Sequence, residues 1–352
     1  MLSKKIARLI ERFSRQILIS EIGTKGQIKL MRSRVAIVGC GATGSFEAEL
    51  LARLGVGYIR IIDKDIIELS NLHRTLIFTE DDVESLKPKA IACADYLNRV
   101  NSDIKIDPII DRLTLTNAEK LLRDVDLILD GTDNIVTRFI INEIAVKYSI
   151  PWIYVGVERW YGIVINIIPG KTPCLKCIIP QIPQRTVDAC KTLGIINTVV
   201  SLATSIAVSN AIKILLGYEV ESALHIIDGF RNEIDKIKIS KNTKCPICVL
   251  NNYEYIGKQQ ERINLICESN QIEINPDEEL KVKLHELKSL NELKIMKKSP
   301  YVAKILFNKQ EIILFENARA IFLKNIGAEK ALKIYNELLS LLEKYGLLMK
   351  LK

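Results

Sequence analysis

Short apolar segments alternate with amphipathic segments along the first half of the chain. The apolar segments have the length and branched side chains of buried strands, and they occupy residues 34–38, 58–62, 104–109, 125–130, 152–156 and 163–168. Helical spacing is found between them, at residues 45–54, 89–100 and 135–148. This alternation predicts an α/β fold: a doubly wound, Rossmann-like, mainly parallel sheet with its ligand at the carboxyl ends of the strands.

The ends of the chain and one long apolar segment complete the pattern. Residues 11–30 are predicted as a helical arm. Residues 194–217 are predicted as a buried or interface helix, because polar residues interrupt the apolar run. A polar linker at residues 251–260 is expected between a first domain, residues 1–255, and a small α+β domain, residues 256–352. The elements expected in the small domain are strands at 301–307 and 311–315 and a helix at 328–344.

Composition narrows the class of protein only slightly. The 352 residues are 48% apolar and 26% charged, which is ordinary for a globular protein. The net charge of +8 comes from interspersed residues, which predicts a mildly basic surface rather than a nucleic-acid groove. The N-terminal residues lack the apolar run of a signal peptide. We therefore expect a cytoplasmic protein that neither spans a membrane nor binds nucleic acid.

A glycine-rich turn follows the first predicted strand. Gly39-x-Gly41-x-x-Gly44 lies between a strand and a helix, where glycines let anionic oxygens approach the backbone and the helix N-terminus offers amide donors. Such a motif alone is also found in ordinary turns. Asp63 ends the next strand about 20 residues later, the position of the acid that binds ribose in dinucleotide-binding folds. Together they predict a nucleotide site.

Two cations and a second acid distinguish the kind of nucleotide. Arg74 and Lys89 follow Asp63 within one connection and could neutralise the charge that develops as pyrophosphate leaves, which favours a triphosphate over NAD. Asp133 follows the strand at 125–130 and could hold Mg²⁺. Asp133 could equally cap the following helix, and both roles could hold at once.

Eight cysteines are present, and four of them form two C-x-x-C pairs. Four thiolates at this spacing suit structural Zn²⁺ with no open coordination position, and the ligands are Cys174, Cys177, Cys245 and Cys248. Cys190 stands in a polar segment with Arg185 and Lys191 nearby, where a thiolate nucleophile is conceivable. Apolar neighbours favour core positions for the remaining three, Cys40, Cys93 and Cys267.

These motifs are found together, and in this order, in one known family. The chain resembles the ThiF/MoeB family, relatives of the ubiquitin-activating enzymes, over residues 11–249. The matching residues are Arg12-Phe13-Ser14-Arg15-Gln16-Ile17, the glycine turn, Asp63-x-Asp65, Ser70-Asn71-Leu72-His73-Arg74, Lys87-Pro88-Lys89, Asp130-Gly131-Thr132-Asp133-Asn134, both C-x-x-C pairs and Cys190. Members of this family use ATP and Mg²⁺ to convert the C-terminal carboxylate of a small β-grasp protein into an acyl adenylate.

The resemblance implies roles for individual residues. The residues that it assigns to the nucleotide are Gly39, Gly41, Gly44, Asp63, Asp65, Ser70, Asn71, Leu72, His73, Arg74, Lys89, Asp133 and Asn134. It implies a homodimer in which Arg15 reaches the phosphates bound by the other subunit. Cys190 aligns with a cysteine that forms a thioester or acyl persulfide with the carrier in some members.

The partner implied is a sulfur-carrier protein ending in Gly-Gly, in a thiamine, molybdopterin or tRNA-thiolation pathway. The C-terminal segment is not a recognisable rhodanese domain, so a separate sulfur donor is expected. The sequence departs from the family pattern at Thr75 and at residues 159–163 and 194–197. The alternatives are an activator of a tRNA base or small peptide, a non-catalytic partner-binding homologue, and a nicotinamide dehydrogenase.

Overall fold

The computed structural model describes residues 8, 11–181, 194–256, 263–266, 271–290 and 292–351. The chain divides into two compact units. The larger contains the glycine turn and both cysteine pairs, and the smaller contains residues 80–88 and the described residues from 263 onward. Each unit is described in turn.

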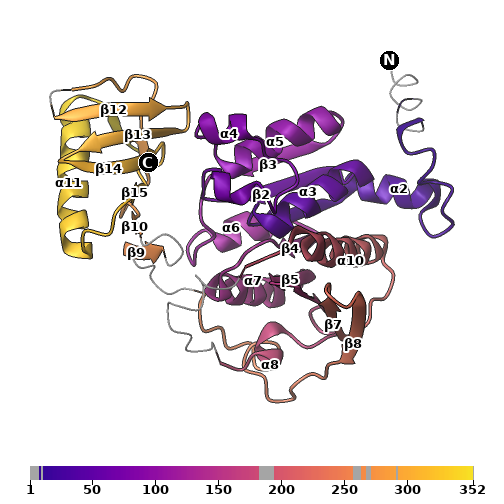
Figure 1. The fold of residues 1–352 in the computed structure, drawn as a ribbon. Coiled ribbons are helices and arrows are strands. Elements are labelled where there is room, and N and C mark those ends of the chain that lie inside the picture. The colour runs from indigo at the N-terminus through magenta and orange to yellow at the C-terminus, as the bar shows by residue number, and fades with distance from the viewer. Residues whose placement is uncertain are drawn as a thin grey trace. The chain divides into compact units, whose positions relative to one another are not determined.

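An eight-stranded sheet forms the centre of the larger unit, in the order β3-β2-β1-β4-β5-β6-β7-β8 (Figure 1). The strands are β1 (Arg34–Val38), β2 (Tyr58–Ile62), β3 (Lys105–Ile109), β4 (Leu127–Asp130), β5 (Trp152–Glu158), β6 (Tyr161–Ile167), β7 (Ala223–Asp228) and β8 (Glu233–Lys238). The first five in this order are parallel, and β6, β7 and β8 continue the sheet in antiparallel pairs. The chain leaves β1 toward β2 and returns to β1's other side at β4, so the topological switch point lies between β1 and β4.

Helices cover both faces of this sheet, as a doubly wound fold requires. The helices of the larger unit are α2 (Gly23–Arg32), α3 (Ala42–Leu54), η1 (Leu69–Asn71), α5 (Lys89–Val100), α6 (Ala118–Leu122), α7 (Ile135–Tyr148), α8 (Leu175–Ile178) and α10 (Asn197–Leu216). Helices α3, α5 and α10 pack on one face, and α6 and α7 pack on the other (Figure 1). The predicted strands and helices of this sheet are therefore found, and the antiparallel strands β7 and β8 are an addition.

Helix α10 corresponds to the long apolar segment. By length and composition it is the one helix in the described part of the chain that could cross a membrane, and half of its apolar window is buried. It packs against α3 and the strands β5 and β6. This packing agrees with the prediction of a buried or interface helix, since core helices pass the same test.

The prediction of one helical arm over residues 11–30 is correct for residues 23–30 but wrong for residues 13–22. Residues 13–22 form successive turns, and the helix begins only at Gly23, which has φ +53°. Phe13 is buried against Gly55, and the Gln16 amide donates to Gln27 and to the carbonyl of Leu54. These tertiary contacts hold the chain in turns and override the local helix propensity of the segment.

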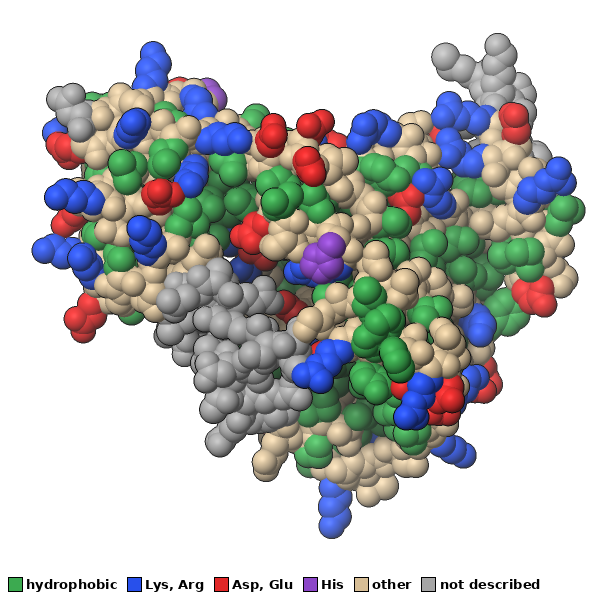
Figure 2. Space-filling model, in the orientation of Figure 1, with side chains coloured by type: hydrophobic (Ala, Val, Ile, Leu, Met, Phe, Trp, Pro, Cys, Tyr) green, Lys and Arg blue, Asp and Glu red, His purple; other side chains and the backbone are tan. Residues whose placement is uncertain are grey.

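A smaller sheet and one long helix form the second unit. Its six antiparallel strands, in the order β12-β13-β14-β15-β10-β9, are β9 (Ile263–Ile266), β10 (Gln271–Ile274), β12 (Leu293–Lys298), β13 (Val302–Phe307), β14 (Gln310–Phe315) and β15 (Ala320–Phe322). A separate pair joins β11 (Leu280–Val282) and β16 (Leu348–Lys350), and the helices are α4 (Glu80–Glu84) and α11 (Ala328–Lys344). The apolar face of α11 packs on β10, around Tyr335 and Leu338. Basic and acidic side chains are interspersed on this unit's surface, as the sequence predicted (Figure 2).

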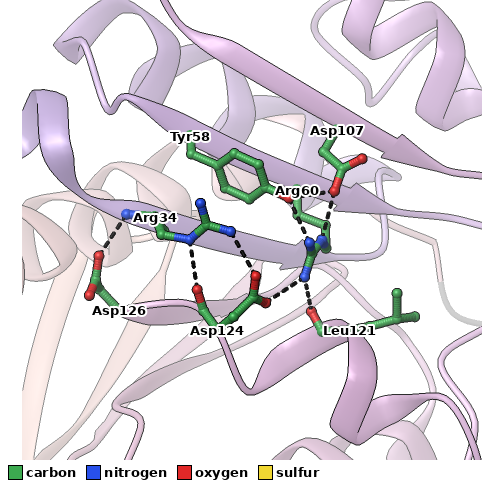
Figure 3. Close-up of polar contacts among 7 residues, drawn as sticks. All are labelled: Arg34, Tyr58, Arg60, Asp107, Leu121, Asp124 and Asp126. Carbon is green, nitrogen blue, oxygen red and sulfur yellow. Dashed lines mark hydrogen bonds and ion pairs between the residues drawn. The ribbon is translucent and has the colours of Figure 1, made fainter.

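A polar cluster connects the parallel strands β1, β2 and β3 to the segment that precedes β4 (Figure 3). Its members are Arg34, Tyr58, Arg60, Asp107, Leu121, Asp124 and Asp126. The Asp124 carboxylate accepts hydrogen bonds from Arg34 Nη2 and Arg60 Nη1, each at 2.7 Å. Arg60 also donates to Asp107 at 2.9 Å, and the Arg34 guanidinium lies 4.0 Å from the centre of the Tyr58 ring. We call these residues the arginine–aspartate cluster.

Candidate active site

Two loops meet at the switch point through three glycines. Gly39, with φ +88°, ends β1, and a side-chain carbon here would collide with Gly131 after β4. A side-chain carbon at Gly44 or Gly131 would collide with the Gly39 carbonyl. Gly41 differs, because a carbon there would meet nothing within 4 Å. Packing therefore explains three of the glycines, whereas Gly41 leaves open space, which fits a phosphate at the start of α3.

Asp63 lies beside this turn, at the end of β2. Its Oδ2 accepts the Cys40 amide at 2.7 Å and its Oδ1 accepts the Asp65 amide at 2.8 Å. The side chain is buried; burial raises the pKa of this carboxyl, and the Lys89 ammonium opposes the rise. Each carboxylate oxygen can accept a further hydrogen bond, so a ribose hydroxyl fits this position.

Lys89 begins α5 and stands among three acids. Its Nζ lies 3.7 Å from Asp65 Oδ2, and its backbone amide donates to the Asp65 carbonyl at 2.9 Å. Burial alone would lower the pKa of Lys89, but the carboxylates of Asp63, Asp65 and Asp133 outweigh it and hold the pKa above its usual range. The ends of β2 and β4 thus converge on one permanently charged ammonium.

In the loop after β4, one residue caps the following helix and its neighbour is the predicted metal ligand. Asn134 caps α7, because its Oδ1 accepts the Thr137 amide at 3.0 Å. Because Asn134 is the capping residue, Asp133 does not fill this role, and its side chain is exposed. Its exposed carboxylate suits Mg²⁺, whose preferred ligands are oxygens.

Arg138 on α7 holds the same loop through hydrogen bonds, and the sequence pattern did not indicate this role. This buried guanidinium donates to Asp130 Oδ2 at 2.7 Å, to the Thr132 carbonyl at 2.6 Å and to the Tyr154 hydroxyl at 3.0 Å. Asp130 in turn accepts the Thr132 amide at 3.0 Å. An arginine one turn into the helix after a strand-end acid is the only sequence signal that could have indicated this support.

The segment that carries Arg74 is fixed by its own backbone. Asn71 is buried, and its Oδ1 accepts the Glu68 amide at 3.1 Å within η1. The Arg74 guanidinium donates to the Ser70 carbonyl, and no acidic side chain within the described residues pairs with it, so its charge remains available for an anion. The Leu76 amide donates to Ser45 Oγ at 3.3 Å, which ties the segment to the first turn of α3.

The remaining predicted site residues that the structure describes are exposed or half-buried. Leu72 is half-buried and His73 is exposed on this segment. Thr75, a departure from the family pattern, donates its hydroxyl to the Asn71 carbonyl at 3.2 Å. Arg15 is exposed on the turns after Phe13. Cys190 lies outside the described residues.

The four cysteines of the C-x-x-C pairs lie together, with all four sulfurs within 4.8 Å of one another. The Sγ–Sγ distances are 3.9 Å for Cys174–Cys177, 3.6 Å for Cys174–Cys245 and 3.5 Å for Cys177–Cys248. A tetrahedral zinc with bonds of about 2.3 Å would place its sulfurs about 3.8 Å apart. The donor set and spacing therefore fit a closed, structural zinc site.

A buried acid on α7 holds the chain segment that follows the cysteine cluster. Glu143 on α7 accepts the backbone amides of Glu254, Tyr255 and Ile256 at 2.6–3.1 Å. The Tyr255 ring stacks on Phe139 with centroids 5.8 Å apart. These contacts hold the segment predicted as a linker against the larger unit as far as residue 256.

The doubly wound sheet and the glycine turn at its switch point place the protein among the Rossmann-like α/β proteins. Residues 13–247 match the ThiF family, and the chain belongs to this family.

Individual relatives agree with the family match. The chain is 34% identical to the sulfur carrier protein ThiS adenylyltransferase of Bacillus subtilis over 331 residues, which cover 93% of this chain and 98% of the relative. It is 30% identical to the SAMP-activating enzyme E1 of Haloferax volcanii, over 69% of this chain and 90% of the relative. A crystal structure of Escherichia coli MccB with ATP shares the fold, with a TM-score of 0.60 and 25% identity over 67% of this chain and 74% of that one.

Proposed function

We propose that this protein is an ATP-dependent adenylyltransferase that activates the C-terminal carboxylate of a sulfur-carrier protein. The observation that carries the proposal is the group of three acids around Lys89, beside a glycine turn with open space at Gly41. Such an arrangement binds the sugar, phosphates and metal of a nucleoside triphosphate. The carrier as substrate is supported by the B. subtilis relative, which the chain covers over 98% of its length.

In the proposed reaction, a carboxylate oxygen of the carrier attacks the α-phosphorus of ATP. The new acyl–phosphate bond forms as the bond to the β-phosphate oxygen breaks, and pyrophosphate leaves with that electron pair. Charge then accumulates on the leaving oxygens, and fixed cations stabilise it. We assign this role to Arg74 and Lys89, with the amides of the glycine turn holding the phosphates.

Asp133 is the residue that would hold Mg²⁺. When bound, the metal would neutralise phosphate charge and orient the chain of phosphates for in-line attack. The buried pair of Asp130 and Arg138 fixes the Asp133 loop, so the carboxylate is positioned before nucleotide arrives. Cys174, Cys177, Cys245 and Cys248 would hold Zn²⁺ in a purely structural role.

We also propose a homodimer in which Arg15 acts on the nucleotide of the partner copy. In support, the segment around Arg15 exposes Leu18, Ile19 and Ile28, with Leu18 73% accessible. Exposed apolar side chains of this kind favour a protein contact.

After adenylation, the Cys190 thiolate would attack the acyl carbon of the adenylate and displace AMP. A separate donor in the cytoplasm would supply the sulfur.

The edge strand β8 is the surface that we assign to the carrier. All its residues are exposed, and Ile234 and Ile237 are about half accessible beside Phe230, which is 72% accessible. An open strand edge with apolar side chains can pair with a strand of a β-grasp protein.

Pyrophosphate exchange in the presence of a carrier ending in Gly-Gly tests the proposal. Arg74→Ala and Asp133→Ala should each reduce exchange by about a hundredfold or more, because each removes transition-state charge stabilisation. Arg99→Ala, an exposed arginine in the last turn of α5, is the matched control and should keep the wild-type rate.

Cys190→Ala separates the two chemical steps. It should retain exchange while losing any covalent link to the carrier, because the thiol acts only after the adenylate has formed. Loss of exchange in this variant would contradict the division of roles, and no exchange by the wild type with any carrier would refute the function.

A further inference from the structure

Glu47 is a buried acid that the proposed mechanism does not use. It lies in the second turn of α3, three residues after Gly44 of the glycine turn. Its side chain is 0% exposed, and neither carboxyl oxygen has a hydrogen-bond partner among the described residues. An ionised carboxylate in such a place is strongly disfavoured, because it loses its hydration and gains nothing in return.

A second buried acid on the same helix differs from Glu47 because its carboxylate has polar partners. Glu49 is also buried, but its Oε1 lies 2.6 Å from Arg53 Nε and accepts a hydrogen bond from the Tyr96 hydroxyl at 3.3 Å. Glu47 has no such cation. Burial, with a further contribution from the Asp130 carboxylate, raises the pKa of Glu47 to about 8.

The elements packed on α3 and the residues next to them carry several charged and titratable groups, of which Asp130 acts directly on Glu47. They are Asp130 on β4 with Arg138 on α7, Asp63 on β2 with Lys89 on α5, the thiols of Cys40 and Cys93, and Lys213, the one charged residue of α10. Asp130 is paired with Arg138, and Asp63 interacts with Lys89, whereas neither carboxyl oxygen of Glu47 has a partner among the described residues. A negative charge on Glu47 would therefore add uncompensated charge behind the glycine turn.

We propose that Glu47 is a positioning residue that must remain a neutral carboxylic acid for the triphosphate to bind, and that loss of its proton in mildly alkaline solution weakens nucleotide binding. This inference rests on the proposed function, because it assigns an anionic ligand to the start of α3. The neutral acid leaves the positive N-terminal end of α3 at full strength for phosphate.

Linkage fixes the direction of the effect. A bound triphosphate makes it harder for Glu47 to ionise, so binding holds the proton on and, near pH 8, takes up a fraction of a proton. By the same reciprocity, the affinity falls as Glu47 loses its proton. The expected fall is about fivefold between pH 7.5 and 9.5, at the low end of typical coupling between two sites.

Calorimetric titration of the whole protein with MgATP between pH 7.5 and 9.5, in buffers of different ionisation enthalpy, tests this. The wild type should show a rising Kd and proton uptake. Glu47→Gln keeps the shape of the neutral acid and should bind with one Kd across this range. Glu49→Gln is the matched control and should retain the wild-type dependence on pH. Equal pH dependence in the wild type and Glu47→Gln would overturn the proposal.

A second pair of measurements reports on Glu47 without nucleotide. A difference infrared spectrum should contain a protonated carboxyl band at pH 7 that Glu47→Gln removes. The melting temperature of Glu47→Gln should exceed that of the wild type increasingly from pH 5 to 8, because unfolding of the wild type alone releases the Glu47 proton, and a rise in pH favours that release. No such band and a constant difference would refute the neutral acid. MgATP binding at no pH, with both signals present, would instead refute the proposed function.

Discussion

The glycines in the turn after β1 are required for different physical reasons, and alanine substitutions can distinguish these reasons. Gly44→Ala should lower the free energy of unfolding by about 2–4 kcal/mol, since the added carbon collides with a backbone carbonyl that cannot move aside. Gly41→Ala meets open space and should cost less than about 1 kcal/mol, yet weaken MgATP binding by about tenfold. Denaturant unfolding and calorimetry check the pair. Equal loss of stability in both variants would contradict the assignment.

The sequence predicted the charged side chains at the strand ends better than the buried charged side chains that support them. Asp63 and Lys89 could be placed because strand-end acids and following cations have fixed positions in this fold. Arg138, Glu143 and Glu47 could not, because a charged residue inside a helical pattern usually faces solvent. Their burial depends on partners distant in sequence, which one-dimensional spacing does not reveal.

At the scale of elements, the cysteine cluster joins two segments about 70 residues apart in the chain. We expect one zinc per chain. Removal of the zinc by a strong chelator should lower the melting temperature by about 5–15 °C, because metal binding is coupled to folding of the two C-x-x-C segments. Metal analysis and calorimetry measure both. Cys177→Ser should reproduce the loss and show no further response to chelator, and a chelator effect of equal size in this variant would argue against the site.

The arginine–aspartate cluster makes the parallel strands sensitive to acid. Partial burial would raise the pKa of Asp124, but Arg60 and Arg34 outweigh it and hold the pKa below its usual value. A lowered pKa contributes stability that is present above the unfolded pKa of about 3.9 and is lost as pH falls through the folded pKa. The Asp124 side chain is 44% exposed and solvent screens its charge, so Asp124→Asn should cost about 1 kcal/mol at pH 7 and less near pH 2.

Urea unfolding at the two pH values measures this difference. Asp235→Asn, an exposed acid on β8, is the control and should change stability by less than about 0.5 kcal/mol at either pH. A difference between Asp124→Asn and the wild type that persists unchanged in acid would show that charge is not the cause.

Element boundaries were predicted well where apolar runs were short and bounded, as at β1, β2 and α11. The N-terminal arm was predicted poorly because Phe13 and Gln16 are drawn into tertiary contacts with the end of α3. The antiparallel strand β8 was missed because it is exposed throughout and its sequence, rich in charge, shows no buried face. Strand β7 was missed although its positions alternate between buried and half-buried.

At the scale of the whole molecule, the proposed dimer makes activity depend on two chains. Arg15→Ala and Asp133→Ala should each be inactive alone in pyrophosphate exchange. Mixed in equal amounts after subunit exchange, they should recover about one quarter of wild-type activity, since half of the dimers contain one complete site. If Arg15 acts within its own chain, the mixture stays inactive. A mixture of Arg74→Ala and Asp133→Ala, both assigned to one subunit's site, is the control and should also stay inactive.

The three-glycine contact has a consequence for how this site can diverge in evolution. Because Gly39, Gly44 and Gly131 exclude any side chain, the two loops that they join admit no substitution at their point of contact. We therefore expect evolution to change the surrounding side chains and to keep the backbone path of the two loops. Homologues adapted to different temperatures or carriers should accordingly differ around this contact and not within it.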